Sequence, residues 1–390
     1  MRVEAVVHTA IETAPLLLDV GVVLLIAATL GLISRRLGFP AILGYLATGV
    51  LVSPFTPGYV AGSDQLVVLA DIGVVLLLFE VGIEIDLRRL GREQRSLLWA
   101  APLQVAIGLL VATPIFLALH VPVMGALLVA LSIAMSSSVV VVNITRSRRR
   151  TTNPPTENAL LGWSVVQDIV GVAIAAVVLT VFGADGRPIA LALGGLVGFA
   201  LLAYLSAKFL PRLLKWVRWE HDLFLIYSVS IGLALAALGT VVFGMPMALA
   251  AFVGGLAINQ GRETDEVRRV LLPFRDLFAV LFFVVMGSLI EPSQIKAALP
   301  FASLLLALLV LVKTLPTWGL ARLGHFNARP IQLAVGLSQI GEFSFVLGSA
   351  ALGAQALTHT QFTAVLLTVV ISIVGSTIMV RLVKPTKAPS

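Results

Sequence analysis

Long apolar runs with few charges constrain this sequence more than any other feature. Of its 390 residues, 58% are hydrophobic and 12% are charged, and the mean hydropathy is +1.02. A soluble domain carries roughly 25% charged residues. Runs of about 20 apolar residues match a hydrocarbon core about 30 Å thick. We therefore predict an all-α polytopic membrane protein, embedded in the lipid bilayer of the cell's inner (plasma) membrane.

Charges and turn residues divide the chain into apolar segments, which predict about thirteen transmembrane helices. The second and ninth segments are short and are flanked by glycine and proline. The segments lie at 15–34, 40–54, 65–87, 97–119, 122–143, 157–182, 188–210, 222–243, 246–260, 271–290, 298–321, 330–352 and 361–382.

The basic residues alternate with these segments. All but four of the 27 Lys and Arg residues follow odd-numbered segments, and the exceptions are Arg2, Arg187, Lys296 and Lys313. Because cytoplasmic loops carry the excess of Lys and Arg, this pattern predicts an N-terminus outside and a C-terminus in the cytoplasm. The net charge of +7 is then a topology signal, and we expect no nucleic-acid partner.

Two pairs of segments resemble each other along the chain. Residues 38–52 resemble residues 244–258, and residues 77–86 resemble residues 282–291, at offsets of 206 and 205. Seven segments separate the copies, so the second copy is inverted in the membrane, as in many secondary transporters. The alternative is chance similarity between glycine-rich apolar helices.

The repeat predicts one transmembrane transporter domain over residues 1–390. Repeat one, segments 1–6, covers about 15–183. A linking segment covers about 188–210, and repeat two, segments 8–13, covers about 222–383.

Segments 5 and 12 contain poor helix-interior sequences at equivalent depths. Segment 5 holds Ser136, Ser137 and Ser138, and segment 12 holds Gly341 and Glu342. Serine competes for backbone hydrogen bonds, and glycine is unfavourable inside helices. Interrupted helices near the membrane midplane can present backbone groups to an ion. The alternative is that these small residues only let helices pack closely.

Asp168 is predicted to lie near the centre of the bilayer. It is eleven residues beyond Glu157, which is about 17 Å along a helix at 1.5 Å per residue. A charged side chain at this depth costs roughly 2.5–3.5 kcal/mol on insertion scales. Gln167 precedes it and adds an amide oxygen.

Lys313 lies mid-way along segment 11, and its counterpart in the repeat is Gly108. Pairing Lys313 with Asp168 would leave neither as a lone buried charge, although such a pair could also serve only to hold helices together. Glu342 is expected either to support the site or to contact the ion. Glu84, near a helix end, is a supporting candidate that could instead bond to backbone or loop arginines.

These residues suggest exchange of a monovalent cation for a proton. Hard cations prefer carboxylate, carbonyl and hydroxyl oxygens, which Asp168, Gln167, Ser137 and Ser138 supply. A single carboxylate that binds either a proton or a cation couples the two fluxes in opposite directions. We expect alternating access at Asp168, with Asp168 as the cation ligand and K⁺ or Na⁺ and H⁺ as transported ions.

At these residues the sequence resembles the monovalent cation:proton antiporter-2 family. Within it, the resemblance is to the membrane domain of glutathione-gated potassium efflux antiporters. The Gln167-Asp168 step and residues 341–345 carry most of it. The matching stretches are LLLFEVGIEIDLRRL (76–90), SSSVVVV (136–142), VVQDIV (165–170), PFRDLFAVLFFVVMGSLI (273–290) and SQIGEFSFVL (338–347).

The resemblance implies a sodium/proton antiporter-like fold in which segments 5 and 12 are crossed broken helices. It implies that Asp168 carries the exchanged ion or proton, that Lys313 is its partner, and that Gln167-Asp168 favours potassium. It also implies a homodimer with an elevator-like movement. Glu80, acidic where an apolar residue is expected, departs from this pattern.

The potassium efflux relatives carry a C-terminal cytoplasmic nucleotide-binding domain, and the sequence given ends at Ser390 without one. Three explanations are open: a separate cytoplasmic subunit regulates the protein, the chain given is shortened, or transport is unregulated. No catalytic triad, metal-ligand cluster or phosphate loop is apparent, so neither an enzyme nor a cofactor is expected. The alternatives to an antiporter are a sodium-coupled organic-anion symporter, a cation channel and a membrane sensor.

Overall fold

The fold is entirely helical in the residues that the structure, a computed structural model, describes. These residues are 2–56, 63–84, 96–146, 151–182, 189–217, 219–245, 247–258, 264–324 and 328–383. No strand occurs within these ranges, which confirms the predicted all-α class.

The described helices follow the apolar segments of the sequence. They are α1 (Arg2–Leu37), α2 (Ile42–Leu51), α3 (Ser63–Glu84), α5 (Leu97–Ala118), α6 (Val123–Ala134), α7 (Ser138–Arg146), α8 (Pro154–Phe182), α9 (Ile189–Val217), α10 (His221–Val241), α11 (Met247–Ile258), α12 (Thr264–Ser288), α13 (Ile295–Leu309), α14 (Leu315–Leu323), α15 (Pro330–Gly336), α16 (Phe343–Gly353) and α17 (His359–Leu382). A five-residue π-helical turn, Val310–Thr314, joins α13 to α14.

Ten helical stretches of the described chain are long and apolar enough to cross a membrane. Three further apolar helices, α2, α11 and α16, are shorter. All of them fall on the predicted apolar segments, and the short α2 and α11 coincide with the second and ninth. The total of thirteen transmembrane crossings stays a prediction.

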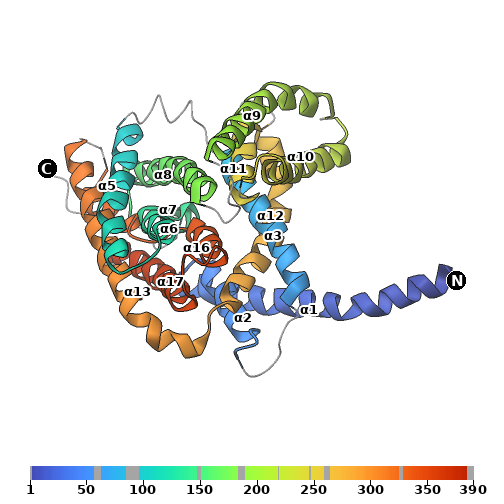
Figure 1. Cartoon of the computed structure of the whole chain (residues 1–390), viewed down its shortest axis with the longest axis horizontal. Helices are drawn as coiled ribbons and strands as arrows, with labels where there is room; N and C mark the ends of the chain where they lie inside the picture. Colours follow the sequence, from blue (N-terminus) through green and yellow to red (C-terminus); the bar gives the residue numbers. More distant parts are fainter. Residues whose placement is uncertain are drawn as a thin grey trace.

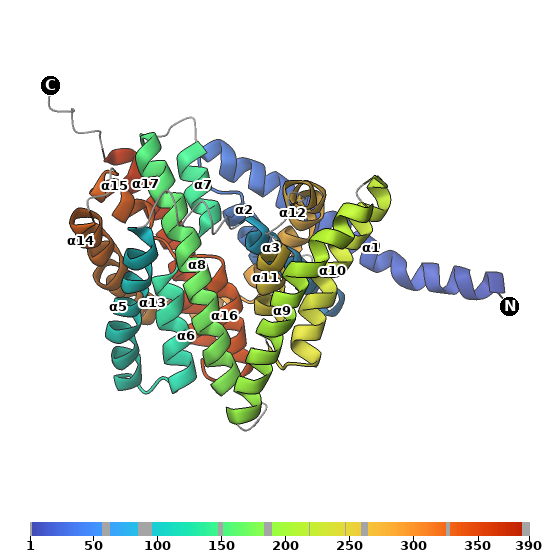
Figure 2. The same ribbon diagram turned by 90° about the horizontal axis from the view of Figure 1, so that it is seen from above.

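The helices gather into two bundles that lie side by side (Figures 1 and 2). We call α5–α8 with α13–α17 the crossover bundle, and α1–α3 with α9–α12 the α3/α12 bundle. Each bundle combines helices from both halves of the chain. In the α3/α12 bundle, α3 packs along both α11 and α12, and α12 also packs along α2.

Two glycine contacts allow these helices to approach at backbone distance. A Cβ atom on Gly49 would lie 2.0 Å from a carbonyl oxygen of α12, and one on Gly287 would lie 2.2 Å from a carbonyl oxygen of α2. Likewise, a Cβ on Gly82 or Gly255 would lie 2.2 or 2.0 Å from a carbonyl oxygen of the facing helix. The sequence repeat aligns Gly49 with Gly255 and Gly82 with Gly287. This alignment exchanges the α2–α12 contact with the α3–α11 contact, as a two-fold axis would.

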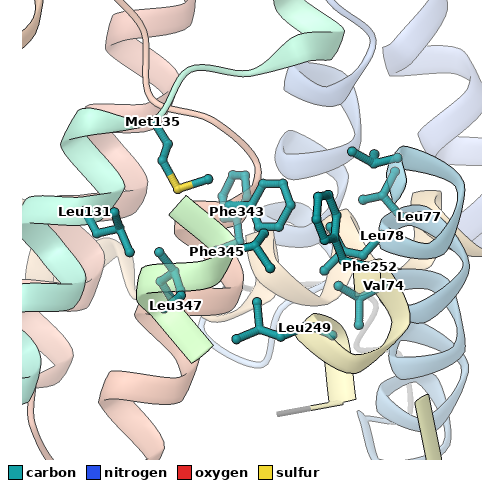
Figure 3. Close-up of a cluster of buried hydrophobic side chains, with 14 of the residues drawn as sticks. Val74, Leu77, Leu78, Leu131, Met135, Leu249, Phe252, Phe343, Phe345 and Leu347 are labelled. Atoms are coloured by element: carbon teal, nitrogen blue, oxygen red, sulfur yellow. The ribbon is translucent and has the colours of Figure 1, made fainter. Parts of the chain in front are cut away.

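An apolar layer fills the interface between the bundles (Figure 3). Phe343 and Phe345 of α16 face Phe252 of α11 and Phe282 and Phe283 of α12. The ring centroids lie 6.0 Å apart for Phe252 and Phe343, and 5.8 Å apart for Phe283 and Phe345. The arrangement is edge-on, which is favourable for aromatic pairs. Both bundles therefore meet on side chains that make no directional polar bond across this layer.

The glycine contacts predict that Gly255→Ala lowers the stability of the protein. The added methyl group would overlap the α3 backbone, and overpacking of this kind costs about 1–3 kcal/mol. Gly319→Ala is the control, because nothing lies within 4 Å of a Cβ atom there and alanine favours a helix. Unfolding temperatures measured in detergent should fall for the first variant only. Equal temperatures for both variants would contradict this packing.

Candidate functional site

Two interrupted helices meet inside the crossover bundle. Residues 135–137 separate α6 from α7, and residues 337–342 separate α15 from α16. The backbone N–H of Gly341 donates to the carbonyl of Met135 at 3.2 Å. A Cβ atom at Gly341 would lie 2.9 Å from the Ser136 backbone, so glycine is required for this approach. The predicted breaks in segments 5 and 12 are confirmed.

Side chains also connect the two breaks. The Ser136 hydroxyl donates to the carbonyl of Leu337 at 2.8 Å. The Gln339 amide bonds to the backbone of Ser137 twice, accepting from its N–H at 2.8 Å and donating to its carbonyl at 3.2 Å. These bonds replace the helical hydrogen bonds that the interruptions remove, because buried backbone groups must be paired.

Lys313 lies at the centre of this crossing and is completely buried. Its Nζ donates to the carbonyls of Met135 and Gln339, both at 2.6 Å. The Met135 carbonyl follows the C-terminal end of α6, where the helix dipole places partial negative charge. Lys313 sits on the π-helical turn just before Pro316, and such turns occur often at functional sites. Its ammonium group therefore holds both broken helices together.

Asp168 lies on α8 with a side chain that is 1% exposed. It lies in the neighbourhood of Lys313. The sequence predicts that Asp168 and Lys313 both lie mid-way along their helices. In the structure both side chains are buried inside the crossover bundle.

A cavity of about 300 Å³ reaches Asp168 from the interface between the bundles. The α7 and α8 wall carries the polar side chains of Asp168, Ser138 and Ser164. The facing wall, from α3 and α12, carries charged side chains. They are Glu80, Arg268 and Arg275. Two of the predicted ion ligands, Asp168 and Ser138, therefore border the same space.

Gln167 points into the crossover bundle. Its Nε2 donates to Oε1 of Gln104 and, at 3.1 Å, to the carbonyl of Ala134. The Gln167 Oε1 is buried and has no hydrogen-bond partner among the described residues. Gln104 in turn donates to the carbonyl of Val312 at 3.4 Å. Gln167 thus ties α8 to α5 and to the end of α6.

Glu342 lies beside the serines of the first break and is 4% exposed. Its Oε1 accepts a bond from the Ser138 hydroxyl at 3.3 Å, and its Oε2 has no hydrogen-bond partner in the described chain. The Ser137 hydroxyl accepts from the N–H of Val140 at 3.1 Å, near the start of α7. Glu84 is the last residue of α3, and its side chain lies outside the described residues.

Sequence reasoning missed three parts of this arrangement. Gln104 and Gln339 were not singled out, although both are amide side chains within apolar segments. Glu80 had no explanation, and the structure supplies one, since both its carboxylate oxygens accept bonds from arginines of α12.

A comparison with protein families decides what kind of protein this site belongs to. The transmembrane part of sodium/hydrogen exchangers matches residues 22–384. The chain belongs to this family. It is therefore a multi-pass transporter that exchanges cations for protons, not an enzyme, and the ions are its substrates. The predicted family resemblance is confirmed.

Individual proteins agree with this assignment. Over 391 residues the chain is 29% identical to a protein of Escherichia coli (strain K12) named "Putative cation/proton antiporter YbaL", covering 96% of this chain and 69% of that protein. The solved structure of the sodium proton antiporter MjNhaP1 from Methanocaldococcus jannaschii at pH 8 is similar, with a TM-score of 0.74 and 18% identity over 95% of this chain and 99% of that one. An electron-microscopy structure of the same antiporter is similar with a TM-score of 0.65 and 15% sequence identity, over 95% of this chain and 98% of that one. The fold is thus the predicted sodium/proton antiporter-like one.

The crossing predicts that Lys313→Met destabilises the protein. Methionine fills a similar volume but removes the Lys313 donor from the buried Gln339 carbonyl and leaves the Met135 carbonyl with the Gly341 N–H alone. A buried group left unsatisfied costs about 1–3 kcal/mol. Lys296→Met, on the same helical run but exposed, is the control. Unfolding temperatures in detergent should fall for Lys313→Met and stay near wild type for Lys296→Met. An unchanged temperature for Lys313→Met would show that the carbonyls do not depend on the ammonium group.

Proposed function

We propose that Asp168 binds the transported cation and the proton in alternation. The support is its position as a buried carboxylate on the wall of a cavity beside the crossing of two broken helices. A cation and a proton compete for the same oxygens, so one site cannot carry both at once. The carrier then exchanges one for the other each time it changes the side to which Asp168 is open.

In this proposal Lys313 neutralises Asp168 when no ion is bound. Its two carbonyl bonds hold the ammonium group at the crossing, and from there its positive charge would stabilise the ionised form of Asp168. Ser138 is the proposed second ligand. Gln167 and Ser137 either contribute oxygen ligands to the cation or stabilise the crossing through their hydrogen bonds.

Three further residues of the crossing act as supports. Ser136 and Gly341 bond the two breaks to each other, and Glu342 holds Ser138 through a hydrogen bond. We assign Glu84 a supporting role from the sequence alone.

We propose K⁺ as the favoured cation, with Na⁺ as a second substrate. The support for potassium is the resemblance of the Gln167-Asp168 step to potassium-favouring relatives. The compared solved structure is named as a sodium proton antiporter, which is the reason to test sodium beside potassium.

The wider arrangement is proposed with the mechanism. Two inverted repeats, about 15–183 and about 222–383, are supported by the reciprocal glycine contacts. We propose a homodimer in the inner membrane with its N-terminus outside, in which the crossover bundle slides along the apolar layer of the α3/α12 bundle. A separate cytoplasmic subunit is the proposed route to regulation.

Asp168→Asn should abolish exchange, because an amide cannot alternate between a bound proton and a bound cation. The measurement is cation-driven pH change inside proteoliposomes, read by dequenching of a ΔpH dye. Asp222→Asn removes an exposed carboxylate at the start of α10 and should leave exchange unchanged. Proton-coupled flux that persists in Asp168→Asn would overturn the proposal.

Cation titrations should give a lower KM for potassium than for sodium, lithium or rubidium when the pH is held constant. Proton release on adding the cation alone should accompany transport, because an antiporter needs no organic substrate. A KM lower for sodium than for potassium would contradict the proposed selectivity. A requirement for an organic anion would instead favour a symporter.

A further inference from the structure

Glu80 is a buried charge in α3 that the proposed exchange at Asp168 does not use. Its side chain is 1% exposed. Arg268 Nε donates to Glu80 Oε1 at 2.7 Å, and Arg275 Nη1 donates to Glu80 Oε2 at 3.0 Å. Both carboxylate oxygens are therefore engaged in charge-assisted bonds, which are the strong ones. Glu80 is held as a fixed charge and is not arranged to carry the transported ion.

The two arginines are placed on one face of α12. They are seven residues apart, which is about two helical turns, and both border the cavity that Asp168 borders from the other side. Their side chains are 36% and 20% exposed, so water screens them only in part. The guanidinium groups of one bundle therefore lie across the cavity from Asp168 of the other bundle.

A cation that travels through this cavity to Asp168 meets these guanidinium groups. Like charges separated by several ångströms repel appreciably when the effective dielectric constant is well below that of water. Arg275 also pairs with Asp276 at 2.7 Å, but the Asp276 side chain is 69% exposed and lies outside the cavity lining, so solvent screens its charge. Of the three charged groups on this wall, Glu80 is the one that lowers the net positive charge from two to one. A cation carrier that kept the arginines without the glutamate would weaken its own substrate binding.

We propose that Glu80 sets the cation affinity of the cavity by neutralising the Arg268 and Arg275 pair. It is a positioning residue that acts through the electrostatic field, since it does not touch the transported ion. The ion pairs of Arg268 and Arg275 with Glu80 link α12 to α3. The negative charge of Glu80 also reduces the repulsion between these arginines and a cation in the cavity. This inference rests on Asp168 being the ion site.

The test compares the KM for potassium and for sodium in proteoliposomes, at constant pH and with ionic strength held constant by choline chloride. Glu80→Gln should raise KM by roughly tenfold, the size expected for one uncompensated charge in a partly screened cavity. Arg275→Gln should lower KM, because it removes a positive charge from the wall. The double variant Glu80→Gln/Arg275→Gln, with the wild-type net charge, should return KM towards the wild-type value.

Two controls separate this field effect from a structural one. Asp71→Asn removes an exposed carboxylate from the same helix, away from the cavity lining, and should leave KM unchanged. Glu80→Asp keeps the charge and should keep KM close to wild type. Unfolding temperatures of all variants report any loss of packing. Loss of packing cannot explain KM values that change in opposite directions in Glu80→Gln and Arg275→Gln.

An unchanged KM in Glu80→Gln would overturn the inference. A KM that rises in Arg275→Gln, or that stays raised in the double variant, would also overturn it. If Glu80→Gln fails to fold, the direction of the shift in Arg275→Gln still decides. These outcomes differ from failure of the proposed function, which is exchange that persists in Asp168→Asn.

Discussion

The ammonium group of Lys313 holds the two broken helices together where they cross. A helix that stops within the hydrocarbon region leaves carbonyl groups that neither water nor its own next turn can satisfy. Here two helices stop at the same place, and Lys313 donates to a carbonyl of each. Gln339 and Ser136 complete the crossing with bonds to the opposite chain segment. The crossing is polar, and each of these bonds joins separate segments of the chain, 26 to 202 positions apart.

The layer between the bundles has the opposite character. Aromatic and aliphatic side chains of α3, α11, α12 and α16 meet there (Figure 3), and dispersion contacts of this kind tolerate sliding better than hydrogen bonds with fixed partners. Charged groups line the cavity at the edge of the layer, where Asp168 on one bundle faces Glu80, Arg268 and Arg275 on the other. In the proposed mechanism, a polar crossing beside an apolar layer would let one bundle move while the surroundings of Asp168 stay the same.

Much of this could be predicted from the sequence because lipid imposes simple rules. Apolar runs located the helices, the serine run and Gly341-Glu342 located the breaks, and depth along the helix singled out Asp168. The partners could not be predicted in the same way. Ser137 meets Gln339 across 202 positions of sequence, and Glu80 meets Arg268 across 188, so no local pattern signals either contact. Gln167 shows a further limit: its neighbour Asp168 borders the cavity while its own amide turns towards Gln104.

Lys313 has a glycine as its counterpart in the repeat, and this asymmetry has an energetic consequence. Gly108 sits against Ala134, and a Cβ there would lie 3.9 Å from the carbonyl of Val312; it has no group that could mirror an ammonium. If the two halves were chemically identical, the carrier turned inward and the carrier turned outward would be mirror states of equal energy. The halves differ at many positions, and Lys313, a buried charge supplied by one half only, is one difference that would remove that equality. If the proposed inverted repeat is the basis of alternating access, the inward-open and outward-open states of the empty carrier therefore need not have equal energy, because Lys313 faces no equivalent group at Gly108.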